Sequence, residues 1–213
     1  MSWKNQPRGS DGRWKAAGGS VGAAVVAGVV FFASGGAGGG GAAVESAASH
    51  SLKGKSSSKE AARKGNRAEA WKRLGLKSLK QTAKRDLKCV TASFSEVRDF
   101  FAHNPCRSLD RLLVAVADSH GNTVVVSVAW VKMPKADTTG KLKRIIDIQG
   151  SGDISPLASG ALGLGGVDFT GHHYASRQSG SLLVVAETAP GGGHPGNELL
   201  DTVAEVAAEF PAP

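Results

Sequence analysis

The chain has 213 residues, a formal net charge of +8 and a sequence pI near 9.7. The charge is unevenly distributed: residues 45–88 hold thirteen Lys or Arg and four Asp or Glu, whereas residues 89–213 hold nine and thirteen. The basic character therefore belongs to the flanks, and this partition excludes an argument from pI for nucleic-acid binding by the whole chain. Residues 89–213 are long enough to bury a core as one domain.

The N-terminal region predicts a membrane anchor. Residues 16–44 carry no charged side chain. Because a bilayer-crossing helix needs roughly 20 apolar residues, the 19 uncharged residues 16–34 predict one transmembrane span followed by a glycine-rich exit. Four bases and one acid in residues 1–15 predict a basic cytoplasmic tail, with the remainder of the chain outside the cell. Two alternatives stay open: a signal peptide cleaved near Gly35-Gly36-Ala37, and a Gly/Ala-rich linker.

Residues 45–88 are expected to form a basic, partly helical linker. Ser, Ala and Lys dominate 46–58, which favours a flexible segment, whereas the Ala, Lys, Arg and Glu of 59–88 favour a helix. The helix would be either a solvated spacer or a basic surface for anionic lipid headgroups or wall polymers. The candidate contacts are Lys72, Arg73, Lys77, Lys80, Lys84 and Arg85.

From residue 89 onward, short apolar runs alternate with turn signals, which predicts the order β-α-β-β-α-β-β-α. Strands are expected at 89–93, 109–118, 123–133, 167–177 and 181–188, and helices at 96–103, 141–148 and 198–210. Hairpin pairing indicates an antiparallel sheet of about five strands, which three helices would cover on one face. The expected fold is therefore an α+β two-layer sandwich, ferredoxin-like in arrangement. The second strand is apolar enough to be buried on both faces, and the glycine-rich segment 149–166 is expected to be a mobile loop.

The two cysteines, Cys89 and Cys106, are 17 positions apart. Their even number and spacing suit a disulfide in an exported domain. The alternatives are two buried free thiols, or a metal site that would add His103 and lacks a convincing fourth ligand.

The sequence contains no recognisable nucleophile–base pair and no recognisable set of metal ligands, so it assigns no catalytic residue, cofactor or metal. Glu187 is the strongest candidate for a binding or structural role, because an acid at the end of an apolar strand needs a partner. It is expected either to form an ion pair or to bind a ligand. The candidate partners are Arg107, Arg111 and Arg177. His172 and His173 are adjacent on a predicted strand and would therefore point to opposite faces.

Three stretches carry a family resemblance. They are Phe100-Phe101-x4-Cys106-Arg107-Ser108-Leu109-x-Arg111, the strand from Thr123 to Met133, and Ser181-Leu-Leu-Val-Val-Ala-Glu187. They resemble a group of uncharacterised actinobacterial proteins that have an N-terminal membrane segment and an extracytoplasmic α+β domain. The resemblance covers residues 89–210. It implies a topology and a location, and it implies no activity.

The expected function is therefore that of a non-enzymatic, membrane-anchored extracytoplasmic domain. It would bind a protein partner or a cell-envelope component through its sheet face or through the loop 149–166. One alternative is an enzyme that acts on an envelope substrate. The other is a cytoplasmic nucleic-acid binder that uses residues 53–88, where Trp71 is the only aromatic residue available for base stacking.

Overall fold

The computed structural model describes residues 54–213 of the chain. Residues 54–63 are helical. The elements that follow are α2 (Arg67–Arg73), β1 (Lys77–Asp86), the 3-10 helix η1 (Cys89–Ala92), α3 (Ser95–His103), β2 (Ser108–Ala117), β3 (Thr123–Lys132), α4 (Ala136–Ile146), the 3-10 helix η2 (Ser159–Leu162), β4 (Tyr174–Ser179), β5 (Leu182–Gly192) and α5 (Asn197–Ala207). The anchor predicted for 16–44 lies outside the described residues.

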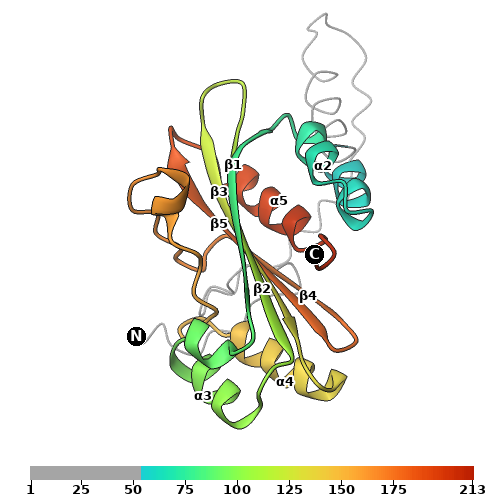
Figure 1. Cartoon of the computed structure of the whole chain (residues 1–213). Coiled ribbons are helices and arrows are strands. Elements are labelled where there is room, and N and C mark those ends of the chain that lie inside the picture. Colours follow the sequence, from blue (N-terminus) through green and yellow to red (C-terminus); the bar gives the residue numbers. More distant parts are fainter. Residues whose placement is uncertain (1–53) are drawn as a thin grey trace, which may run out of the picture.

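The five strands form one antiparallel sheet in the order β1-β2-β3-β5-β4 (Figure 1). This confirms the α+β class and the five-stranded antiparallel sheet. The ferredoxin-like arrangement is wrong, because α3 connects β1 and β2, which are antiparallel neighbours, whereas a split β-α-β unit joins parallel strands. β3 is the central strand, and β1 and β4 are the edges.

Helical cover lies on both faces of the sheet, so the two-layer prediction is wrong. Val126, Val128 and Trp130 of β3 belong to a buried cluster with α5. The alternating residues Ala129 and Val131 belong to a second cluster with α3 and α4. Because successive side chains of a strand point to opposite faces, α5 and the α3–α4 pair lie on opposite sides. The predicted two-sided burial of the second strand is confirmed by β2.

The first cover consists of α5, α2 and the helical segment 54–63 (Figure 1). Trp71 of α2 meets Phe210 edge to face, with ring centroids 5.1 Å apart, and both side chains are buried. Nε1 of Trp130 donates to the carbonyl of Phe210 at 2.9 Å. Ion pairs join Lys55 and Lys59 to Glu205 at 2.7 and 2.6 Å, and Arg63 to Glu209 at 2.9 Å.

The second cover consists of α3, α4 and the segment 155–169, and α3 and α4 lie side by side (Figure 1). Val97 and Phe101 of α3 and Leu142 of α4 are buried against the sheet. Leu162 of η2 is buried against Leu113, Ala115 and Val125 in a smaller cluster. The segment expected to be a mobile loop therefore contributes to the core.

In the structure, the segment 59–88 is not the linker helix that the sequence predicts. Helical structure ends near Arg73, Gly75 follows with φ +73°, and 77–86 form β1. Ala70, Trp71 and Leu76 enter the core of the domain. Helix propensity is a weak prior, and pairing with β2 overrides it. Most of β1 is exposed on both faces, so its sequence lacks the apolar alternation that marks a strand.

The predicted strand 89–93 is also wrong, because residues 89–92 form η1 and residue 93 makes only a single bridge with Ile154. β1 already occupies the outer side of β2, so this segment turns away from the sheet. The other elements follow the prediction, although α4 begins at Ala136 and β4 only at Tyr174. Within residues 54–213, no helix combines the length and apolar character needed to cross a membrane.

Candidate functional site

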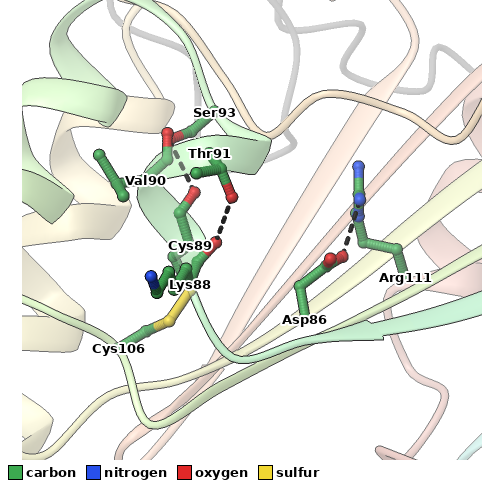
Figure 2. The surroundings of a disulfide bond; sticks show 8 residues. All are labelled: Asp86, Lys88, Cys89, Val90, Thr91, Ser93, Cys106 and Arg111. Carbon is green, nitrogen blue, oxygen red and sulfur yellow. Dashed lines mark hydrogen bonds and ion pairs between the residues drawn. A yellow bond between two sulfur atoms is a disulfide. The ribbon is translucent and has the colours of Figure 1, made fainter.

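A disulfide between Cys89 and Cys106 encloses α3 (Figure 2). It joins the start of η1 to the turn before β2, with the two Cα atoms 6.1 Å apart. The predicted cross-link is confirmed, and neither thiol is left for the alternative metal site with His103. Closing a loop of this size stabilises the fold by about 3 kcal/mol in the chain-entropy model.

The segment that follows Cys89 holds the loop 151–155 through backbone hydrogen bonds. The bonds run from Phe94 N to Asp153 O (3.1 Å), from Glu96 N to Ser151 O (2.8 Å) and from Ser155 N to Ala92 O (2.8 Å). Within the segment, Oγ of Ser93 donates to the Cys89 carbonyl at 3.0 Å (Figure 2). The covalent restraint on η1 is therefore passed to a loop that is at least 59 positions away in sequence.

Gly152 allows this loop to approach the start of α3 closely. Its φ is +104°, and a Cβ built on it would lie 2.3 Å from the carbonyl oxygen of Phe94. Ser95 opposite has φ +52°, a conformation that non-glycine residues seldom adopt. The contact therefore selects glycine at position 152 for two reasons, its backbone conformation and the lack of space.

The two segments form the wall of a pocket of about 290 Å³, which we call the Glu187 pocket. Its lining is largely apolar and glycine-rich: Phe94, Ile146, Ile148, Gln149, Gly150, Gly152, Asp153, Ile154, Pro156, Phe169, Thr170, Gly171 and Glu187. Glu187 is only 8% exposed, and its Oε1 accepts a short hydrogen bond from the backbone N–H of Gly171. Phe94 is 46% exposed. An apolar recess with a few polar groups is the usual form of a ligand site.

The structure separates Glu187 from Arg177, one of its predicted partners. Glu187 pairs in register with Tyr174 and so faces the α3–α4 cover, whereas Arg177 pairs with Val184 and faces α5. Arg177 forms an ion pair with Glu209 at 3.3 Å. The predicted pairing across this hairpin is therefore wrong.

Arg111 and Arg107 have other described neighbours. Arg111 donates to Asp86 at 2.7 Å (Figure 2). It also donates to the carbonyl of Ser155 at 2.7 Å. Burial disfavours the charged form of Asp86, but hydrogen bonds from Arg111 and Lys84 outweigh it and hold the pKa of Asp86 below its ordinary value. Arg107 is exposed, and its backbone N–H donates to the carbonyl of Lys132 at 2.7 Å. Arg111 thus ties β1 to the segment that continues from the pocket wall.

A second recess, an open groove of about 950 Å³, lies at the start of α5. In it, Nδ1 of His173 is 2.8 Å from Oδ1 of Asp201, and His172, Asp168 and Glu198 also line the groove. The expectation that the two histidines face opposite ways is wrong, because β4 begins only after them. Sequence reasoning missed Asp201, whose contact spans 28 positions and leaves no local signal.

The predicted basic contacts fall into two groups. Lys72 and Arg73 lie at the end of α2, and Arg73 pairs with Glu69 at 2.8 Å. The other four lie along the edge strand β1 and are exposed: Lys77, Lys80, Lys84 and Arg85. Arg85 pairs with Asp110 at 2.5 Å and Lys84 with Asp86 at 3.0 Å. Four of the six predicted contacts therefore lie along an edge of the sheet and not on one side of a helix.

Comparison with known proteins finds no matching family model, no matching curated protein and no matching solved structure.

Proposed function

We propose that the chain is an exported binding domain, held at the membrane by residues 16–44 with its N-terminus in the cytoplasm. Its partner is a protein or an anionic component of the cell envelope. The observation that carries the proposal is the disulfide between Cys89 and Cys106. Structural disulfides persist in oxidising compartments outside the cytoplasm and are rare inside it. The basic residues before the apolar stretch favour the same orientation.

The surface of the described domain supports a binding role. The Glu187 pocket offers an apolar recess, a buried carboxylate and a wall fixed by the cross-linked segment. The exposed edge of β1 adds a basic surface. Both faces of the sheet are covered, so the expected use of an open sheet face is replaced by these two regions.

The nucleic-acid alternative has less support. Its one aromatic residue for base stacking, Trp71, is 1% exposed and packs on Phe210. The basic residues of β1 remain, but single-stranded nucleic acids are usually held by stacking as well as by charge.

The second candidate function is an envelope-acting enzyme, and the pair of His173 with Asp201 is the observation that favours it. A carboxylate on Nδ1 orients an imidazole for proton transfer at its other nitrogen. Among the groove hydroxyls, that of Thr188 already donates to the carbonyl of Leu200 at 2.9 Å. Loss of an envelope-substrate turnover in His173→Gln, with Glu187→Gln unaffected, would favour this candidate.

Protease accessibility in expressing cells tests the proposed location. The full chain with a C-terminal epitope is expected to sediment with membranes after a carbonate wash, and external protease is expected to remove the epitope from spheroplasts. The variant Val25→Arg with Val29→Arg places two charges in the apolar run and is expected to lose the membrane fraction. An epitope that is soluble and protected in intact spheroplasts would contradict the proposal.

A further inference from the structure

The edge strand β1 is the feature that the proposed function leaves unexplained. It pairs with β2 along 77–86, and among the described residues no strand lies on its other side. A ten-residue edge presents a row of backbone donors and acceptors to which another strand can add. Proteins commonly protect such edges with short length, charged side chains, bulges or a covering helix or loop. β1 is long and exposed on both faces, although it carries lysines and one irregularity in its pairing.

The side chains of this edge are basic and partly apolar. Lys77 and Lys80 make no ion pair with any residue of 54–213, whereas Lys84 and Arg85 are paired within the sheet. Of the three exposed large hydrophobic residues in the described part of the chain, Leu79 lies in this strand and is 52% exposed, and Leu87, 76% exposed, directly follows its end. Lysines alone would protect an edge from aggregation, but exposed leucines beside them do not serve that purpose.

A hollow of about 430 Å³ adjoins the start of the strand. It lies between α2 and β1 and is lined by Arg67, Ala68, Ser78, Leu79, Lys80 and Gln81. The irregularity in pairing between Ser78 and Lys80 falls at this place, so Leu79 is out of the regular register with β2. The hollow has room for an apolar side chain of an added strand.

We infer that β1 accepts an acidic, extended peptide segment of a protein partner as a sixth strand of the sheet. The inference deepens the proposed function, on which it rests, by naming the class of partner. The exposed backbone donors and acceptors of β1 favour a peptide. Lys77 and Lys80 favour acidic side chains on that peptide, and the hollow beside Leu79 accepts an apolar side chain. Along such a segment, acidic residues would alternate with apolar or β-branched residues.

The other occupants complement the edge less well. A second copy would bring together two strands that each carry four bases and one acid, so the charges of the two edges would repel overall. Residues 1–53 carry five bases and two acids, so they share the sign of the edge. An anionic polymer would satisfy the lysines but would leave the backbone groups of the strand unpaired.

The test uses the full chain in detergent micelles and a fluorescein-labelled decapeptide of alternating glutamate and valine. A second peptide has the same side chains but carries methyl groups on its four central backbone nitrogens, which removes their donors without changing the charge. We expect the methylated peptide to bind at least about tenfold more weakly in fluorescence anisotropy, since several backbone hydrogen bonds are lost. The double variant Lys77→Glu with Lys80→Glu is expected to weaken the unmodified peptide by about tenfold. Lys135→Glu with Lys141→Glu, an equal change of charge near α4, should have little effect.

Equal binding of the two peptides would overturn the inference, because it would indicate charge attraction of the kind that an anionic polymer also provides. Failure of the unmodified peptide to bind would overturn it too. If the chain forms dimers without peptide, and the variant Lys77→Glu with Lys80→Glu abolishes these dimers, the edge would be assigned to a second copy instead. Because the peptide comparison is made on the purified wild-type chain, none of these results depends on the location of the protein in cells, which the protease experiment tests separately.

Discussion

The two covers of the sheet are held by different kinds of bond. On the face of α3 and α4, the disulfide of Cys89 fixes η1, and η1 fixes the loop 151–155 through backbone hydrogen bonds. On the face of α5, the contact of Trp71 with Phe210 and the ion pairs of Glu205 hold the N-terminal helices. The cover of α3 and α4 therefore depends on redox state, whereas the cover of α5 depends on apolar packing and, more weakly, on pH and salt.

This difference separates the two regions that we propose for binding. The Glu187 pocket has a wall formed by the cross-linked segment, so its shape is restrained by a covalent bond. The edge strand β1 follows the helices of the other cover and is held by pairing with β2 and by ion pairs such as Arg111 with Asp86. Reduction of the disulfide should therefore affect the pocket wall directly, and the edge strand mainly through the hydrogen bond of Arg111 to Ser155.

The largest expected effect comes from Trp71→Ala, which breaks the cover on the α5 face. The side chain is fully buried against Phe210, so its removal should cost about 3–5 kcal/mol of unfolding free energy, measured by chemical denaturation. Leu87→Ala, at a 76% exposed position, is the control and should change stability by no more than about 0.5 kcal/mol. Equal effects of the two variants would contradict the assignment of Trp71 to the core.

Removal of the disulfide should break the other cover. The pair Cys89→Ala with Cys106→Ala is expected to lose about 3 kcal/mol. Amide hydrogen exchange should become faster in 151–155. In α5, it should change no more than the overall loss of stability requires. Reductant should destabilise the wild type and leave the double variant unaffected. Unchanged protection of 151–155 would show that the cross-link does not support the pocket wall.

The close approach of Gly152 to Phe94 gives a further prediction for the cross-linked region. Gly152→Ala should cost about 1–3 kcal/mol, because alanine is strained at φ +104° and its Cβ would meet the carbonyl of Phe94. Gly121→Ala is the matched control: its φ is +84°, but no atom lies within 4 Å of the added Cβ. Thermal unfolding should therefore show a smaller loss for position 121, and the reverse order would contradict the proposed contact.

The smallest effect concerns the ion pairs of Glu205. Burial disfavours its charged form, but hydrogen bonds from Lys55 and Lys59 outweigh it and hold the pKa of Glu205 below its ordinary value of 4.5. A lowered pKa in the folded state adds stability above pH 4.5, and this stability is lost as pH falls through the folded pKa. At pH 7, Glu205→Gln should therefore lose about 1 kcal/mol, and the difference from wild type should shrink in acid.

Denaturation of both proteins between pH 3 and pH 7 measures this difference. Glu60→Gln removes an exposed pair with Lys64 and serves as a control with a smaller expected change. A difference between Glu205→Gln and wild type that grows as the pH falls would contradict the assigned role.

The parts of the fold that could be predicted from sequence are those with a buried pattern. The apolar runs of β2, β3 and β5 and the amphipathic spacing of α3 and α5 identify these elements because burial selects their residues. β1 gave no such signal, since an exposed edge strand has no buried face. The two-sided burial of β2 did indicate that both faces of the sheet are covered, and on one face the N-terminal helices join α5, although propensity suggested that their segment was a linker.

The candidate site was predictable in part. Glu187 could be singled out because a carboxylate at the end of an apolar strand is unusual, and the glycine-rich loop beside it could be recognised from composition. The contact of Gly152 with Phe94 and the pairing of His173 with Asp201 could not, because they join residues distant in sequence. Such contacts are set by the packing of whole elements, for which a single sequence carries no local mark.

The central claim, that a cross-linked domain lies outside the cytoplasm, is tested most directly by the state of Cys89 and Cys106 in intact cells. Cells are treated with or without a membrane-impermeant reductant, quenched in acid, denatured and alkylated with a maleimide mass tag. We expect no tag on the chain from untreated cells and two tags after treatment with the reductant. Two tags on the chain from untreated cells would contradict the exported, disulfide-bonded domain.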